Sequence, residues 1–402
     1  MEQHAEEVER TFRASRGKAV ATLIRLYGDI SLAEDAVQDA FVTAVRRWPR
    51  DGLPDNPAGW IVTTARNRAV DVVRRNRRGR ELAVSTARAA LNADGSPDED
   101  DDQLRLIFTC CHPALGVEHQ VALTLRLIGG LSVAEVAAAF LVSEETMAKR
   151  LVRAKYKIKA AAIPYRVPDE TQLPSRLRAV LSVLYLVYNA GLEDRARSEL
   201  RTEALRLARL LVALMPGEPE VAGLLALVLL SEARVPARES QGTLVLLKDQ
   251  DRSLWDLRLI GEGQALVLAC LRQRKLGPFQ LQAAIQAMHC AASRYEDTNW
   301  RSIVWFYDRL IAVMPTPVVA LNRAIAVGEV DGPAAGLRLI DEVAGELAAY
   351  HPLHAARGAL LRSLGRESEA AAAYARAAEL ARSEPARQFL QGRAEAIPPA
   401  GG

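Results

Sequence analysis

Apolar residues recur every three or four positions along almost the whole 402-residue chain, and we find no segment that alternates apolar and polar residues. Such spacing places apolar side chains on one face of an α-helix, whereas a half-buried strand requires alternation. Aromatic residues make up only 5% of the sequence, and most apolar residues are Ala, Leu and Val, which favours helices over a sandwich of strands. The sequence therefore predicts an all-α protein, and this length predicts more than one domain.

The charges of the chain fall into blocks. Lys and Arg exceed Asp and Glu by 15 to 11 in residues 1–80 and by 9 to 4 in residues 104–167, whereas residues 81–103 carry 7 acidic residues and 1 Arg. Basic blocks favour a polyanionic partner, and an acidic segment of this kind cannot bury a core. We therefore expect domains at 1–80, 104–165 and 170–392, with an acidic flexible linker at 81–103.

The last of these domains contains repeated segments. The run LVALMP at 211–216 recurs as LIAVMP at 310–315. Gly358, Tyr374 and Ala377 stand at spacings that resemble a tetratricopeptide repeat (TPR), in which small residues let two antiparallel helices pack closely. We expect a TPR-like domain of stacked helices, neutral overall because residues 168–402 carry 27 residues of each sign.

Nothing in the sequence predicts export or membrane insertion. The first residues are acidic and polar, unlike a signal peptide. The longest run without Asp, Glu, Lys, Arg or His, 179–192, has 14 residues, fewer than the ~18 that a membrane span needs. Four Cys residues exclude a disulfide scaffold and favour a reducing compartment. We expect a cytoplasmic protein without membrane contact.

Residues 131–158 have the pattern of a helix-turn-helix. Ser132 and Glu135 form a capping box that begins a short helix, and Ser143 caps the next helix. On that second helix the apolar stripe leaves an opposite face that carries Glu145, Lys149, Val152 and Arg153. A short helix followed by a helix with a basic outer face is suited to the major groove of DNA, although a solvated helix in any three-helix domain gives the same pattern.

A basic helix is predicted to begin at Asn56 and Pro57, an N-cap followed by proline. Residues 56–80 contain seven Arg and one acidic residue, which exceeds what solubility requires. Asn67, Asp71, Arg74 and Arg78 align on one face, where Arg can neutralise phosphate and Asn can pair with an unpaired base edge. Trp60 could either brace the fold or stack on a base.

The preceding helix carries an acidic face. Ser31 and Glu34 have the spacing of a capping box, and Glu34, Asp35, Gln38 and Asp39 lie on its polar side. Two interpretations are open, a solvated face and a surface that docks on another protein.

These three segments in this order resemble an RNA polymerase sigma factor of the extracytoplasmic-function group in the sigma-70 family. The resemblance covers residues 5–160, where that group has region 2, a linker and region 4. The segment LLKDQDRSLWD at 246–256 and the TPR-like units resemble the subgroup with a long C-terminal extension, which is thought to regulate activity.

The resemblance implies roles for individual residues. The face that docks on the clamp helices of core polymerase matches Asp35, Gln38 and Asp39. Asn67 matches the residue that captures a flipped base of the −10 element, within a −10 region that also includes Trp60, Arg66, Asp71, Arg74, Arg75 and Arg78. The recognition helix for the −35 element matches Glu145, Lys149, Val152 and Arg153.

Two further clusters invite a chemical interpretation. Cys110, Cys111 and His112 suggest a metal, but adjacent Cys residues cannot easily ligate one ion and no CxxC pair accompanies them, so buried structural thiols are favoured. The turn with Asp249, Arg252, Trp255 and Asp256 suits either a cap between repeats or a regulatory contact with the sigma core.

We therefore expect a non-catalytic specificity subunit that binds core RNA polymerase and promoter DNA without a metal or other cofactor, and whose extension contacts its own sigma core. Two rival interpretations remain, a TPR-type scaffold and a DNA-binding regulator that never joins polymerase.

Overall fold

The computed structural model describes residues 2–76, 99–140, 142–193, 197–240, 243–273, 276–381 and 383–396. The chain folds into two compact units, Met1–Leu214 and Met215–Gly402. Helices form nearly all of the regular structure that is described, which confirms the all-α prediction. Short strands at Glu239–Ser240 (β1) and Thr243–Leu244 (β2) pair as an antiparallel hairpin.

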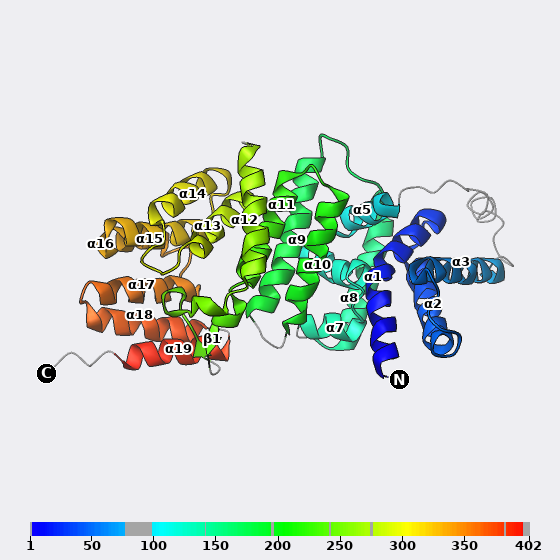
Figure 1. The fold of residues 1–402 in the computed structure, drawn as a ribbon, viewed down its shortest axis with the longest axis horizontal. Helices are drawn as coiled ribbons and strands as arrows, with labels where there is room; N and C mark the ends of the chain where they lie inside the picture. Colours follow the sequence, from blue (N-terminus) through cyan, green and yellow to red (C-terminus); the bar gives the residue numbers. More distant parts are fainter. Residues whose placement is uncertain are drawn as a thin grey trace. The chain divides into compact units, whose positions relative to one another are not determined.

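All regular elements in the described part of the first unit are helical, and they run from blue to green in Figure 1. Its elements are α1 (Glu2–Tyr27), α2 (Ile30–Asp51), α3 (Pro57–Asn76), α5 (Glu99–Cys110), α6 (Val117–Leu123), the π-helical turn η3 (Thr124–Ile128), α7 (Val133–Ala139), α8 (Glu144–Ala160), α9 (Leu173–Glu193) and α10 (Glu199–Leu214). The first three pack on one another, α1 also packs on α5 and η3, and α9 and α10 pack on α5.

The predicted linker overlaps this unit at one end. Residues 77–98 lie outside the described residues, whereas 99–103 form the start of α5. Asp102 is only 1% exposed, and its carboxylate pairs with Arg25 Nε at 2.7 Å. Because α1 supplies a cation, this end of the acidic run is helical and packed rather than flexible. The other predicted domain boundaries stay predictions.

The second unit stacks helices in pairs along the chain. Its elements are α11 (Pro219–Glu232), η5 (Val235–Ala237), β1, β2, η6 (Leu247–Asp249), η7 (Arg252–Leu254), α12 (Leu257–Arg272), α13 (Pro278–Ala291), α14 (Trp300–Val313), α15 (Pro317–Asp331), α16 (Pro333–Val343), α17 (His351–Ser363), α18 (Glu367–Leu380) and α19 (Glu384–Glu395). Residues of α11 are buried on every side between α12 and α13, as expected of a helix that is apolar all round.

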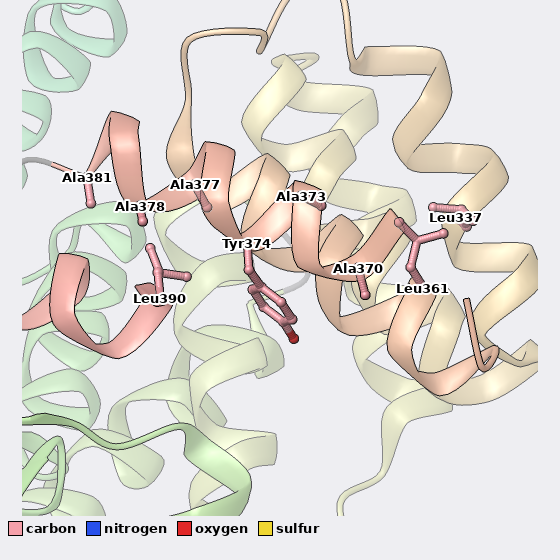
Figure 2. Packing of buried hydrophobic residues seen from close by; sticks show 9 residues of the cluster. All are labelled: Leu337, Leu361, Ala370, Ala373, Tyr374, Ala377, Ala378, Ala381 and Leu390. Carbon is pink, nitrogen blue, oxygen red and sulfur yellow. The ribbon is translucent and has the colours of Figure 1, made fainter. Parts of the chain in front are cut away.

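The predicted repeat unit corresponds to the pair α17 and α18. Tyr374 lies among Ala370, Ala377 and Leu361 in a buried cluster that continues to Leu390 of α19 (Figure 2). A Cβ atom added to Gly358 would lie 3.1 Å from the Tyr374 ring. The absence of a side chain at Gly358 therefore lets the two helices approach closely, as the spacing predicted.

We predict that Gly358→Val destabilises the second unit by about 1–3 kcal/mol, the usual effect of overpacking a core. Hydrogen exchange of α17 and α18 would measure the loss in the full chain. The control is Gly392→Val on α19, where an added Cβ meets nothing within 4 Å. Equal protection in both variants would contradict the close packing at Gly358.

Candidate nucleic-acid interface

Helix α2 begins two residues before the position that its sequence suggests. The N-cap is Asp29, whose side chain accepts a hydrogen bond from the Leu32 amide at 3.0 Å, so the predicted capping box at Ser31 is wrong. Ser31 instead lies inside the first turn of the helix, which begins at Ile30. This leaves the Glu34 carboxylate available for other partners.

The exposed side of α2 carries three of the predicted docking residues. Asp35, Gln38 and Asp39 are exposed, while the opposite side of the helix is buried. Gln38 Oε1 accepts a hydrogen bond from Arg16 Nη1 at 3.2 Å. Burial, with a smaller contribution from the neighbouring Glu34 carboxylate, raises the pKa of Asp35. The face is thus a compact acidic surface.

Glu34 does not belong to that surface, contrary to the sequence interpretation. It is 7% exposed, and its carboxylate contacts Arg126 Nε at 2.5 Å, Lys155 Nζ at 3.0 Å and Arg16 Nη2 at 3.2 Å. Burial would raise the pKa of Glu34, but the three cations outweigh it and the pKa lies below its usual value. No pattern within one helix reveals such partners, because Arg126 and Lys155 are more than 90 residues away.

Helix α3 begins as predicted. The Asn56 side chain accepts a hydrogen bond from the Gly59 amide at 2.9 Å, and Pro57 is the first helical residue. Trp60 is half-buried and packs edge-on against Trp48, with ring centroids 5.4 Å apart. This contact braces α3 against α2, and it leaves part of the Trp60 ring accessible.

Three of the predicted −10 residues share the outer side of α3. Asn67, Asp71 and Arg74 are exposed, at the helical spacing that the sequence indicates. Arg66 is half-buried, and its side chain forms a hydrogen bond with the side chain of Tyr27 on α1. The side chain of Arg75 and the whole of Arg78 lie outside the described residues.

Helices α7 and α8 form the helix-turn-helix. Ser132 and Glu135 make both hydrogen bonds of the predicted capping box, and Ser143 accepts a hydrogen bond from the Thr146 amide at 3.2 Å. The buried residues of α8 are Met147, Leu151, Ala154 and Ile158, as the apolar stripe predicts.

The opposite face of α8 is open. Lys149, Val152 and Arg153 are exposed, and Tyr156 is 72% exposed. Glu145 pairs with Lys149 at 2.6 Å on the surface. An exposed helix with basic and apolar side chains side by side has the chemistry to contact phosphates and base edges in a major groove.

Arginines of α9 and α10 donate to carbonyl groups at the ends of α5 and η3, the elements that precede the helix-turn-helix. Arg176 Nη2 donates to the Phe108 carbonyl at 2.6 Å. Arg206 Nη2 donates to the Ile128 carbonyl at 3.2 Å.

Arg197, between α9 and α10, makes a third contact of this kind. Its Nη1 donates to the Ala139 carbonyl at 3.1 Å. The acceptors lie in the last turns of α5, η3 and α7, where carbonyl groups lack intrahelical partners and carry partial negative charge. The sequence gives no sign of these contacts, since nothing distinguishes the three arginines from solvated ones.

Cys110 and Cys111 are buried free thiols, as the sequence favoured. Cys110 and Cys111 are at most 1% exposed, and burial raises the pKa of Cys111 to about 11. Among the described residues, no group of three or more His, Cys, Asp or Glu side chains is placed to hold a metal ion.

The turn at 249–256 is tied to its own unit. Arg252 Nη1 donates to the carbonyls of His289 at 3.0 Å and Ala292 at 2.5 Å, at the end of α13. Its guanidinium stacks on Trp255, with 4.5 Å to the ring centroid, and Trp255 is buried.

The two acidic residues of the turn also have intrachain partners. Asp256 is the N-cap of α12. Asp249 forms an ion pair with Arg393 of α19, with 3.6 Å between Oδ2 and Nη2. The side chains left exposed there include Leu254 and Leu257. A regulatory contact at this turn stays a prediction, with these apolar side chains as its available surface.

Comparison with known proteins decides the family. Residues 11–79 match sigma-70 region 2 and residues 105–158 match sigma-70 region 4. The chain is 32% identical to the ECF RNA polymerase sigma factor SigL of Mycobacterium tuberculosis over 130 residues, which is 32% of this chain and 73% of SigL. The chain belongs to the extracytoplasmic-function (ECF) family of RNA polymerase sigma factors. The helices α1 to α3 are thus its region 2, and the helix-turn-helix belongs to its region 4.

The part beyond region 4 is shared with other proteins too. Residues 176–271 match a family of unknown function (DUF6596). An uncharacterised protein of Rhizobium meliloti is 42% identical over 384 residues, covering 92% of this chain and 90% of that protein. By contrast, the similarity to the sigma factor CarQ of Myxococcus xanthus is confined to 116 residues at 29% identity, which cover 29% of this chain and 66% of CarQ. This ECF sigma factor therefore has the long helical C-terminal extension that the sequence predicted.

No described helix is long and apolar enough to cross a membrane.

Proposed function

We propose that the protein joins core RNA polymerase as its specificity subunit and directs it to promoters, where it recognises and melts DNA. The observation that carries this proposal is the combination, in one chain, of a region 2 with an acidic exposed face and a region 4 with an open recognition helix. A scaffold needs neither surface, and a regulator that works without polymerase needs only the second. In this role the protein makes no bond itself and acts in the cytoplasm, where polymerase and promoter DNA are its partners.

Each surface has one task in this mechanism. Asp35, Gln38 and Asp39 dock on core polymerase. The outer side of α3 holds the −10 strand, because Asn67 can pair with the edge of an unstacked base while Arg66, Arg74, Arg75 and Arg78 neutralise phosphates. Trp60 offers its accessible ring edge and Asp71 a hydrogen-bond acceptor. On α8, Glu145, Lys149, Val152 and Arg153 face the −35 duplex.

Asn67 and Arg74 separate base recognition from phosphate binding. We predict that Asn67→Ala impairs open-complex formation and changes the preference at one −10 base, since a base-edge contact is worth ~1–3 kcal/mol. Arg74→Ala should weaken binding to all promoters and lower the salt slope by ~1. Permanganate footprinting of promoter variants and binding over a salt series measure the two effects. Normal opening and preference in Asn67→Ala would refute its assignment.

We also propose that the C-terminal extension tunes the activity of the sigma regions. The support is that Arg176, Arg197 and Arg206, all beyond region 4, donate to carbonyls in or beside it. A charge-assisted hydrogen bond to a helix end stabilises that end. We infer that residues 173–214 serve as a support for region 4, and that residues 215–402 form a separate module for a regulatory partner or contact.

Truncations distinguish these two parts of the extension. A chain cut after Ile163 loses the three arginines, and we predict that region 4 is destabilised by at least about 2 kcal/mol, since hydrogen bonds to charged groups contribute ~1.5–3 each. A chain cut after Leu214 keeps them and should protect region 4 from hydrogen exchange as the full chain does. Its transcription, compared with that of the full chain, reports the effect of residues 215–402. If both truncated proteins transcribe as the full chain does, the extension has no tuning role.

A further inference from the structure

Three buried nitrogen atoms of the second unit belong to Arg252 and to two residues that lie against it. Arg252 donates from Nη1 to the carbonyls of His289 and Ala292. Its Nη2 is buried and has no hydrogen-bond partner in the described part of the chain, and the same is true of Trp255 Nε1 and His289 Nδ1. The Trp255 ring centroid lies 4.5 Å from Arg252 Cζ. Arg252, Trp255 and His289 therefore form one group, which we call the Arg252 cluster.

The Arg252 cluster is covered by the rest of its unit. Trp255 is 5% exposed and His289 is 9% exposed, whereas Arg252 is half-buried. Buried polar groups in folded proteins almost always have a partner, because an unsatisfied one loses its hydration without compensation. Three unsatisfied nitrogen atoms at one place therefore indicate a site whose acceptor comes from outside the chain. The half-buried Arg252 leaves one edge of that site open to solvent.

The electrostatic potential at the cluster is positive. Arg234 lies near the same ring as Arg252, with its Cζ 6.0 Å from the Trp255 centroid. Burial and the charges of Arg234 and Arg252 together lower the pKa of His289 to about 3. Burial raises the pKa of the neighbouring Cys290 thiol, and the same two arginines oppose that rise. His289 is therefore a neutral imidazole at neutral pH, and its Nδ1 can carry a hydrogen and donate it.

The donors of the cluster determine the kind of ligand that fits. Guanidinium and indole nitrogen atoms can only donate hydrogen bonds, so the ligand must present acceptors. A water molecule offers acceptors but no charge, whereas an oxyanion also pairs with the guanidinium groups. A phosphate group has three terminal oxygen atoms, one for each of the three side chains, and arginine is well suited to bind it. The cluster thus favours a phosphate group over a carboxylate, which has two oxygen atoms.

The cluster lies at the ends of three helices, α11, α12 and α13, that pack on one another. Arg234 lies directly beyond the C-cap of α11, and His289 lies in the last turn of α13. Trp255 immediately precedes Asp256, the N-cap of α12. The Asp256 amide donates to the Ala233 carbonyl at 2.9 Å, which fixes the turn to the end of α11. A ligand held by the cluster would therefore connect the ends of all three helices.

We propose that Arg252, Trp255 and His289, with Arg234 beside them, bind the phosphate group of a small molecule. The phosphate oxygens accept hydrogen bonds from Arg252 Nη2, Trp255 Nε1 and His289 Nδ1, and the positive charge of Arg234 strengthens the binding. This site goes beyond the proposed role at the promoter, because it involves only the second unit and needs neither polymerase nor DNA. It assigns a class of ligand to the C-terminal extension.

Calorimetric titration of the full-length protein with inorganic phosphate tests the site. At neutral pH and constant ionic strength we expect saturable binding of one phosphate per chain, and weaker binding of acetate, which carries a carboxylate. Hydrogen exchange with and without phosphate locates the site, since added protection is expected at 252–256 and at the end of α13. No saturable binding of phosphate, or tighter binding of acetate than of phosphate, would overturn the proposal.

Trp255→Phe keeps an aromatic ring against Arg252 and removes the Nε1 donor. We expect the dissociation constant for phosphate to rise at least about tenfold, because a hydrogen bond to a charged ligand is lost. Phosphate should raise the melting temperature of the wild-type protein and leave that of the variant nearly unchanged. The matched control is Trp305→Phe on α14, since Trp305 is 44% exposed and lies outside the cluster. It should bind phosphate as the wild-type protein does.

Arg252→Gln removes the central charge and keeps an amide that can donate to the end of α13. It should also raise the dissociation constant for phosphate at least about tenfold. Its control is Arg323→Gln, which removes the same charge from an arginine that pairs with Asp308 at 2.7 Å. This control loses positive charge in the same unit and should keep the wild-type affinity.

The variants separate a built site from general attraction between charges. A loss of affinity in Trp255→Phe and Arg252→Gln but in neither control supports the site. Equal affinity in Trp255→Phe and its control, or an equal loss in Arg252→Gln and Arg323→Gln, would overturn it. If Arg252→Gln fails to fold, Trp255→Phe decides the matter. Since none of these measurements involves transcription, the site and the proposed function stand or fail separately.

Discussion

Burying a single carboxylate imposes much of the arrangement of the first unit. Glu34 is almost inaccessible to solvent, and a buried carboxylate without partners would be protonated or would prevent folding. The chain meets this requirement with Arg16 from its own region, Arg126 from a π-helical turn and Lys155 from the recognition helix. Since two of these cations belong to region 4, satisfying Glu34 brings the two sigma regions together.

The extension is not one uniform addition to a sigma factor. Residues 173–214, with the helices α9 and α10, belong to the first compact unit, and their Arg176, Arg197 and Arg206 donate to carbonyl groups at helix ends in region 4. The helices from α11 onwards form a unit of their own, with α17 and α18 packed through Gly358 and Tyr374. Residues 176–271 match DUF6596. We infer that this match includes both the part that supports region 4, up to Leu214, and the start of the separate second unit.

Local signals in the sequence predicted most helix starts and buried helix faces, and the predictions that were wrong have a common cause. The capping residues Ser132, Ser143 and Asn56 and the buried stripe of α8 were predictable, because caps and helical periodicity depend on neighbours within a few residues. The acidic face on α2 was predicted on the same basis, but it included Glu34, whose cations come from distant parts of the chain.

Ser31 and the turn at 249–256 show the same limit. Ser31 has the spacing of a cap, yet Asp29 two residues earlier is the better-placed acceptor. Trp255 and Arg252 have the polar and aromatic character of a contact site, but Arg252 stacks on Trp255 and donates to a carbonyl group at the end of α13. A short sequence pattern shows which kinds of interaction a segment can make. Which residue it interacts with is decided by tertiary packing.

Run-off transcription with purified core polymerase that lacks any other sigma factor tests the central claim most directly. The account predicts a specific transcript when the wild-type protein is added, and none when both Asp35 and Asp39 are replaced by Arg, because reversed charges on α2 repel the docking surface. The double variant should still fold and bind promoter duplex through α8. A transcript of equal yield from the folded double variant would contradict the docking assignment, and no transcript from the wild-type protein at its own promoters would contradict the account as a whole.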